Sequence, residues 1–259
     1  MTSIRFAGLM LEAQGEGSAV VMLHGLGATS NSWQTLLPAL SAYRVIRPDL
    51  PGAGRSPTPH AQLSVASIID SVLSAVKQLG ISRAHFVGHS FGALICQQIA
   101  LSRPEWVASL SLYGPIQAPA ETARQRLRER AQLARSEGMC VVADQILLTG
   151  VASSAQRENP TALAFVRESH MRQDAEGFAR SCEALAAVET IDASRISCPA
   201  LLVTGTEDAL APPNLARLYQ ERMRNCRVRI IERCGHWTPI EKPAECAKAL
   251  ANFLRDHQL

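Results

Sequence analysis

Short apolar runs alternate with longer amphipathic segments in residues 1–115 of the chain and again in residues 194–259. The runs are rich in Val, Ile and Leu, as is typical of strands buried on both faces, and the segments between them have the period of helices. The pattern predicts an α/β protein with a mostly parallel central sheet flanked by helices. The expected strands are Ile4–Phe6, Ala19–Leu23, Tyr43–Arg47, Ala84–Val87, Ala108–Leu112, Ala200–Thr204 and Arg227–Ile231. The expected helices between them are Trp33–Ser41, Ser64–Leu79, Phe91–Ser102, Pro213–Met223 and Pro243–Asp256.

The alternation stops between residues 116 and 193, where the apolar residues recur only with a helical period. We therefore predict one core built from residues 1–115 and 194–259, with a helical cap of residues 116–193 inserted after the strand that ends near Leu112. Such an insertion would lie over the carboxyl ends of the strands, where open α/β sheets bind their ligands. The expected cap helices are Glu121–Glu137, Met139–Leu148, Pro160–His170 and Ala175–Val188.

The segment Gly88-His89-Ser90-Phe91-Gly92 matches the G-x-S-x-G pattern and lies between an expected strand and an expected helix. In that context the pattern predicts a nucleophile elbow, a sharp turn that exposes a serine hydroxyl above the sheet. The turn forces the serine into a strained backbone conformation. A glycine two residues to either side leaves room where a Cβ would collide with facing backbone. Ser90 is therefore the candidate nucleophile.

A second glycine-bearing turn, His24-Gly25-Leu26-Gly27, follows the expected strand Ala19–Leu23. In proteins with a nucleophile elbow, the loop at this place supplies one backbone N–H of an oxyanion hole, and the residue after the nucleophile supplies the other. These donors would be the amides of Leu26 and Phe91. Only the backbone geometry matters for such a donor, so apolar side chains at both positions are compatible with this role.

Two further strands also end in residues that can take part in catalysis. The strand Ala200–Thr204 is followed by Asp208, and the strand Arg227–Ile231 is followed by His236. Ser90, Asp208 and His236 thus occur in the order nucleophile, acid, histidine, each just past a predicted strand, as expected of a catalytic triad on an α/β-hydrolase fold. Glu207, the neighbour of Asp208, is the alternative acid.

The charge and hydropathy of the chain exclude several classes of partner. Its net charge of +3 is small, with 19% charged and 47% hydrophobic residues, so we expect neither nucleic acid nor a membrane as a partner. No run reaches the roughly 18 apolar residues of a membrane span. Met1–Gln14 lacks a basic region followed by an apolar one, so we expect no secretory signal.

Cysteine usage predicts a reducing compartment. The seven cysteines are an odd number without a C-x-x-C pair, which is typical of reduced thiols in a cytoplasmic protein rather than of a disulfide framework. No spacing of Cys and His indicates a structural zinc, and the triad chemistry requires no cofactor. We expect no metal and no organic cofactor.

The whole chain resembles the α/β-hydrolase superfamily. Asp49-Leu50-Pro51-Gly52-Ala53-Gly54-Arg55-Ser56 resembles its D-x-x-G-x-G-x-S turn, and residues 235–243 (G-H-W-T-P-I-E-K-P) resemble its histidine loop. Within the superfamily the chain is most similar to 3-oxoadipate enol-lactonases, whose E-G-M-x-x-x-A-D segment resembles residues 137–144 and whose E-G-Y helix start resembles residues 174–185. The cap departs from that family because Gln145–Gly150 contains no Trp. The resemblance therefore implies the chemistry more strongly than the substrate.

Together these features predict a serine hydrolase that acts on a small carboxylic ester or lactone through an acyl-enzyme. Two alternatives stay open on the same fold. One is the hydrolysis of C–C bonds in aromatic ring-cleavage products, and the other is a cofactor-free perhydrolase or a ligand receptor. The sequence leaves a homo-oligomer open as well.

The candidates for substrate binding are aromatic residues near the predicted site and arginines of the cap. Trp33 and Trp237 are expected either to line the pocket or to pack in the core. The arginines either form a solvated helix face or include one that turns inward to hold a substrate carboxylate. The candidates for such a carboxylate clamp are Arg128, Arg157, Arg167 and Arg172.

Overall fold

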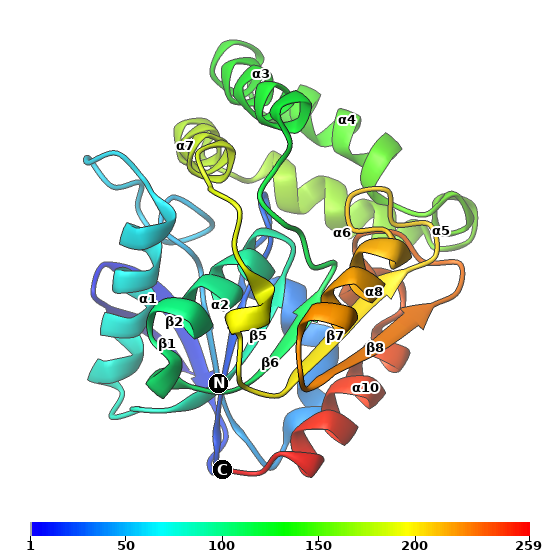
Figure 1. Cartoon of the computed structure of the whole chain (residues 1–259). Helices are drawn as coiled ribbons and strands as arrows, with labels where there is room; N and C mark the ends of the chain where they lie inside the picture. The colour runs from blue at the N-terminus through cyan, green and yellow to red at the C-terminus, as the bar shows by residue number, and fades with distance from the viewer. Residues whose placement is uncertain (1) are drawn as a thin grey trace.

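The computed structural model describes residues 2–259 of the chain. Eight strands form its sheet: β1 (Thr2–Phe6), β2 (Leu9–Gln14), β3 (Ala19–Leu23), β4 (Arg44–Pro48), β5 (Ala84–His89), β6 (Val107–Tyr113), β7 (Ala200–Gly205) and β8 (Cys226–Ile231). They lie in the order β1-β2-β4-β3-β5-β6-β7-β8 (Figure 1). Strand β2 is antiparallel to both neighbours, and every pair from β4 across to β8 is parallel. The predicted fold class is confirmed.

Helices cover both faces of this sheet. They are η1 (Ser30–Leu40), α1 (Val65–Gln78), α2 (Phe91–Ser102), η2 (Pro104–Trp106), η3 (Ala193–Arg195), α8 (Pro213–Arg222), α9 (Thr238–Glu241) and α10 (Pro243–Asp256). One apolar core lies between the sheet and helices α1, α2 and α8, and a second lies between the opposite face and η1 and α10 (Figure 1). The segment expected as an α-helix from Trp33 is instead the 3₁₀ helix η1, which contains Pro38, a residue without a backbone N–H to donate.

Strand β2 is an element that the hydrophobic pattern does not predict. It contains Glu12, which would face solvent in an ordinary alternating strand but is 5% exposed here. The carboxylate of Glu12 forms an ion pair of 2.5 Å with the guanidinium of Arg47, on the neighbouring strand β4. The inward charge is therefore compensated by a residue that is distant in the sequence.

Five helices lie together beyond the carboxyl ends of the parallel strands (Figure 1). They are α3 (Glu121–Glu137), α4 (Met139–Gly150), α5 (Ser153–Glu158), α6 (Pro160–Met171) and α7 (Ala175–Ala186), and we call them the cap helices. Four agree with the predicted helices to within two residues, whereas α5 is too short to give a periodic signal. The cap boundaries at residues 116 and 193 stay a prediction.

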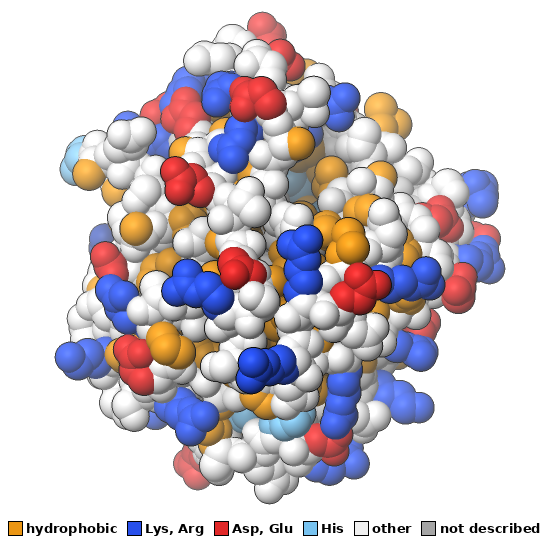
Figure 2. All heavy atoms as spheres, in the orientation of Figure 1, with side chains coloured by type: hydrophobic (Ala, Val, Ile, Leu, Met, Phe, Trp, Pro, Cys, Tyr) orange, Lys and Arg blue, Asp and Glu red, His pale blue; other side chains and the backbone are white. Residues whose placement is uncertain are grey.

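The distribution of charged side chains and the state of the cysteines agree with what the composition predicts. Basic and acidic side chains are interspersed over the face drawn in Figure 2, without an area dominated by one sign. All seven cysteines are unpaired. Within residues 2–259, none of the helices has both the length and the apolar character that a membrane crossing requires.

Replacing Glu12 by Leu should lower the free energy of unfolding by about 3–5 kcal/mol, because Arg47 would stay buried without its carboxylate partner. Urea denaturation followed by circular dichroism measures this change. Asp256→Asn is the matched control, because Asp256 pairs with Arg227 at the surface, where an ion pair contributes about 0–1 kcal/mol. Equally small losses in both variants would contradict the importance of the buried pair.

Candidate active site

Ser90 occupies the turn between β5 and α2 in a backbone conformation that L-residues rarely adopt. Its φ is 51°, and its N–H donates to the carbonyl of Tyr113 at 2.9 Å. The flanking glycines make the turn sterically accessible. A Cβ on Gly92 would lie 2.1 Å from the carbonyl oxygen of Leu23, and one on Gly88 would lie 2.5 Å from that of Gly92. The structure thus has the strained strand-to-helix turn that the motif predicts.

Three loops bring Ser90, His236 and Asp208 into one chain of hydrogen bonds. Ser90 Oγ lies 2.8 Å from His236 Nε2, and His236 Nδ1 lies 2.9 Å from Asp208 Oδ2 and 3.0 Å from Asp208 Oδ1. A carboxylate can only accept, so Nδ1 carries the proton and Nε2 is free to accept the proton of the serine hydroxyl. This is the geometry of a nucleophile, a base and a group that orients the base.

The surroundings of Asp208 keep it ionised although it is only 2% exposed. Burial alone would raise the pKa of this carboxyl. The charge and hydrogen bond of His236, together with the amides of Leu210 and Ala211, outweigh burial and lower the pKa below its ordinary value. Those amides donate to Oδ1 at 2.9 and 2.8 Å. A charged Asp208 favours the imidazole tautomer with a proton on Nδ1.

Glu207, the alternative acid, has a different set of partners. One of its carboxylate oxygens accepts hydrogen bonds from the backbone N–H and the hydroxyl of Ser153, at 2.9 and 2.8 Å. Ser153 is the first residue of cap helix α5, so Glu207 ties the cap to the loop after β7. The imidazole of His236 is bonded to Asp208 instead.

The two expected oxyanion donors lie on segments adjacent to Ser90. Phe91 is the first residue of α2, and the first amides of a helix have no intrahelical partner. Leu26 lies in the loop after β3 and is partly exposed. Neither amide donates to another of the described residues, so both are free to bind an oxyanion.

Residues around the end of α6 hold the loop that carries Leu26. The hydroxyl of Ser169 donates to the carbonyl of Gly27 at 3.0 Å, and the amide nitrogen of Gln173 donates to the same oxygen at 3.3 Å. The amide oxygen of Gln173 in turn accepts from the N–H of Gly54. The cap therefore contacts the loop that would form half of the oxyanion hole.

Two other histidines near the triad are neutral and have structural partners. His24 donates from Nδ1 to the carbonyl of Gly25 at 2.8 Å and accepts at Nε2 from the N–H of Leu50, and burial lowers its pKa. His89 Nε2 donates to the carbonyl of His236 at 2.8 Å. Burial and the nearby charge of His236 lower the pKa of His89 to about 3. Neither ring is placed to act as the base toward Ser90.

The two tryptophan candidates have different environments. Trp237 packs against His89, with ring centroids 5.2 Å apart, and its indole lies next to Gly150 of the cap. Trp33 is completely buried in the core between the sheet and η1, where it meets Tyr113 edge-on. Trp33 therefore packs in the core, one of its two expected roles, and a side chain enclosed by the core has no surface to offer a substrate.

The four arginine candidates for a carboxylate clamp are exposed, and the clamp stays a prediction. Arg128 and Arg167 point to solvent and pair with Glu121 and Asp144 at 3.2 and 2.7 Å, and the side chain of Arg172 is 72% exposed. Guanidinium groups keep their hydration at the surface unless a buried partner compensates them. No hydrogen bond or ion pair joins Ser90 or His236 to any of the four candidates, which are Arg128, Arg157, Arg167 and Arg172.

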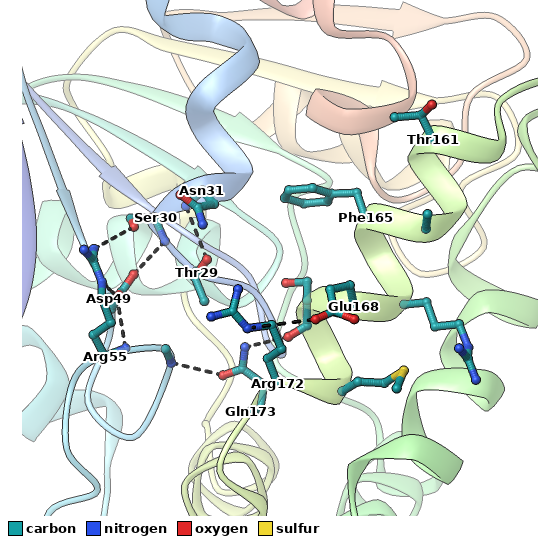
Figure 3. Close-up of a pocket in the computed structure, with 15 residues that line it drawn as sticks. Thr29, Ser30, Asn31, Asp49, Arg55, Thr161, Phe165, Glu168, Arg172 and Gln173 are labelled. Carbon is teal, nitrogen blue, oxygen red and sulfur yellow. Dashed lines mark hydrogen bonds and ion pairs between the residues drawn. The ribbon is translucent and has the colours of Figure 1, made fainter. Parts of the chain in front are cut away.

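A cleft of about 760 Å³ lies at the seam between the cap and the core (Figure 3). Phe165 extends across it from α6 toward Asn31, and Arg172 lies near Thr29. Arg167 is among its lining residues, but Ser90, Asp208 and His236 are not. The cleft therefore does not indicate where Ser90, His236 and Asp208 lie. Their hydrogen bonds to one another identify the candidate active site.

Glu241 is a buried residue whose role the sequence does not predict, although it lies in the histidine loop. One of its carboxylate oxygens accepts from the N–H groups of Gly235 and Ala152, at 2.9 and 3.0 Å, and the other accepts from Trp237 at 3.0 Å. Burial raises its pKa, and the three hydrogen bonds partly oppose that effect. Glu241 thus joins both neighbours of His236 to the cap.

Gly114 is a second residue that sequence reasoning misses. It follows β6 with a φ of 52°, and a Cβ there would lie 2.9 Å from two atoms of the His236 ring. The ring therefore rests on bare backbone. The only signal in the sequence is a glycine two residues after the predicted strand Ala108–Leu112.

Comparison with known proteins places this arrangement in a family. A model of the alpha/beta hydrolase fold matches residues 18–243. The chain belongs to the α/β-hydrolase family.

Several members of this family are similar over most of their length. The putative carbamate hydrolase RutD of Klebsiella pneumoniae is 35% identical over 214 residues, which cover 79% of each chain. The 2-hydroxymuconate semialdehyde hydrolase of Pseudomonas putida is 28% identical and covers 95% of this α/β-hydrolase and 90% of its own length. The solved enol-lactonase of Burkholderia xenovorans LB400 is 27% identical, covers 98% of this chain and all of its own, and has a TM-score of 0.87.

These similarities confirm the superfamily resemblance and include an enol-lactonase among the solved structures. The relatives named above are two hydrolases and an enol-lactonase by name, so the α/β-hydrolase described here is an enzyme of the hydrolase class. Because these names refer to different substrates, the bond that this enzyme cleaves has to be inferred from the chemistry of its site.

Glu241→Gln should lower kcat for p-nitrophenyl acetate about tenfold, because the amide NH₂ would face one of the three N–H groups and shift the loop that carries His236. Steady-state kinetics with circular dichroism measures the effect, and KM should change little. Glu245→Gln is the control, since Glu245 pairs with Arg229 at the surface and takes no part in the hydrogen bonds of Glu241. Wild-type kcat in Glu241→Gln would contradict the positioning role.

Proposed function

We propose that this α/β-hydrolase cleaves a small carboxylic ester or lactone through an acyl-enzyme, with Ser90 as nucleophile, His236 as base and Asp208 as the orienting acid. The observation that carries the proposal is the continuous chain of hydrogen bonds from Ser90 Oγ through the imidazole to the carboxylate. The amides of Leu26 and Phe91 support it, because neither donates to another of the described residues and the chain just before Leu26 lies against the start of α2.

In the first half of the reaction, Ser90 Oγ attacks the carbonyl carbon and its proton passes to His236 Nε2. The carbonyl oxygen becomes an oxyanion that accepts hydrogen bonds from the amides of Leu26 and Phe91. One such donor contributes about 2.7–4 kcal/mol in comparable enzymes. The tetrahedral intermediate then expels the leaving oxygen, which takes the proton from His236. In a lactone this oxygen stays attached to the acyl chain.

In the second half, water attacks the acyl-enzyme. His236 accepts one proton of the water, and the resulting hydroxide adds to the same carbonyl carbon. Collapse of the second tetrahedral intermediate releases the carboxylic acid and returns the proton to Ser90. The charge of Asp208 stabilises the imidazolium that forms in each half, without itself taking a proton.

The cap helices enclose the substrate in this proposal. The carbonyl of Gly150, the last residue of α4, accepts the N–H of His236 at 2.9 Å, so the cap reaches the catalytic base. Figure 2 shows a recess below α3 and α4 with a histidine side chain inside it. Covering this recess would exclude water during acylation and would let cap residues select the substrate.

Hydrolysis of a C–C bond is a second candidate, supported by the 28% identity to 2-hydroxymuconate semialdehyde hydrolase. The two reactions are distinguished by a panel of short acyl esters, lactones and vinylogous diketo acids. We expect the highest kcat/KM for an ester or a lactone. A clear preference for the diketo acids would favour the second candidate.

Ser90→Ala should reduce kcat for p-nitrophenyl acetate by about 10⁴-fold or more, because loss of the nucleophile disables the triad as a unit. Absorbance at the wavelength of p-nitrophenolate measures turnover, and circular dichroism checks the fold. Ser71→Ala, on the distant helix α1, is the control and should match the wild type. Turnover at the wild-type rate in Ser90→Ala would exclude Ser90 as nucleophile.

Asp208→Asn should keep the fold but lower kcat about 10⁴-fold, because an amide facing Nδ1 favours the wrong imidazole tautomer. The same ester assay measures the loss, with Glu207→Gln as the paired variant. If Glu207→Gln were disabled while Asp208→Asn stayed active, the acid would have to be reassigned.

A further inference from the structure

His170 is a buried histidine that the mechanism above does not use. It lies near the end of cap helix α6 and is 1% exposed. Its ring contacts Gly27, the residue after the expected oxyanion donor Leu26. A Cβ on Gly27 would lie 2.2 Å from Cδ2 and 2.3 Å from Nε2 of this ring. The absence of a side chain at Gly27 therefore allows a cap imidazole to reach the oxyanion loop.

The protonation state of this imidazole follows from its partner. Nδ1 lies 2.8 Å from the carbonyl of Val166, and a carbonyl only accepts, so Nδ1 carries the proton. Burial lowers the pKa of His170 to about 4, against the opposing effect of that hydrogen bond. The ring is thus neutral near pH 7, with an unshared electron pair on Nε2.

Aromatic neighbours hold the ring in this orientation. Trp237 meets it edge-on with centroids 5.4 Å apart, and Phe178 does so at 6.3 Å. Trp237 directly follows His236 in the chain. The imidazole of His170 is therefore placed between the loop that would bind the oxyanion and the loop that carries the base.

Nε2 of His170 makes no hydrogen bond with any residue of the described part of the chain, residues 2–259. Nε2 is not among the completely enclosed side-chain atoms that lack a partner, so it keeps a small accessible surface through which a donor can reach it. His85 Nε2 and Trp33 Nε1 are also unpaired, but His85 lies in β5 beside Ser109 and Trp33 in the core. Thr238 Oγ1, in the histidine loop, has no partner either, but it is completely enclosed. His170 Nε2 has no partner, keeps an accessible surface and belongs to a ring that contacts the oxyanion loop.

We propose that Nε2 of His170 accepts a hydrogen bond from an N–H or O–H group attached next to the reacting carbonyl of the substrate. The proposal rests on the proposed function and names the substrate class of that site. The substrates that fit are carbamates with an N–H and esters or lactones of 2-hydroxy acids. A carboxylate at the same place would face the electron pair of Nε2, which repels it.

The test compares substrates that differ only in the donor. One pair is phenyl N-methylcarbamate and phenyl N,N-dimethylcarbamate, and the other is phenyl 2-hydroxyacetate and phenyl 2-methoxyacetate. The readout is the ratio of kcat/KM between the donor-bearing and the capped member of each pair, measured by phenol release. The carbamate pair tests an N–H donor and the hydroxyacetate pair tests an O–H donor.

His170→Phe keeps an aromatic ring against Trp237 but removes the acceptor, so we expect it to lower the ratio about tenfold for at least one pair. His170→Gln offers an acceptor oxygen and should recover part of the ratio, and it is the second variant if Phe impairs folding. Ser169→Ala is the matched control, because it removes a cap contact to Gly27 and leaves His170 in place. Its ratio should equal that of the wild type.

Each outcome bears on one proposal. An unchanged ratio in His170→Phe, or an equal loss for donor-bearing and capped substrates, would overturn the role of His170 and leave a purely structural one. A wild-type enzyme that hydrolyses simple phenyl esters but none of the donor-bearing ones would also overturn it. Loss of Ser90-dependent hydrolysis for every ester would instead mean that the proposed function is wrong.

Discussion

Helix α2 can meet the end of strand β3 only because Gly92 has no side chain, since a Cβ there would lie 2.1 Å from the carbonyl oxygen of Leu23. This contact sets the distance between two segments with different parts in the proposed chemistry. The start of α2 carries Ser90 and the amide of Phe91, and the loop after β3 carries the amide of Leu26. Nucleophile and oxyanion donors therefore depend on one approach of backbone to backbone, which fixes them before any substrate binds.

Much of this arrangement can be predicted from the sequence because most of the parallel strands are buried on both faces and read as apolar runs. The exception is the edge strand β8, which precedes His236 and alternates in burial. β3, β5, β6 and β7 are uniformly buried. β2 is not predictable in this way, because Glu12 interrupts its pattern and its burial depends on Arg47 in another strand. The hydrophobic pattern predicts a strand well when its buried residues are apolar. It predicts a strand poorly when a buried charge is neutralised by a residue that is distant in the sequence.

The same limit applies to the site. Ser90, Asp208 and His236 could be predicted because each follows a recognisable strand in a known order. Trp33 could not be assigned, since a tryptophan in the core and one in a pocket look alike in sequence. His170 gave no signal because its partners are backbone atoms and rings from three separate segments. The arginines of the cap suggested a carboxylate site, and two of them, Arg128 and Arg167, pair with acidic neighbours at the surface.

The cap and the core share loops that matter for the proposed chemistry. Glu207 and Glu241 of the core hold the backbone at Ala152 and Ser153, and the carbonyl of Gly150 accepts the N–H of His236. The short junction 150–154 is therefore as much part of the histidine loop as of the cap. A cap exchanged with that of a relative would carry its own substrate preference, but it would also reposition the base unless this junction travelled with the matching glutamates. In this enzyme the cap is not an independent module, and grafting it would require cutting points outside residues 150–154.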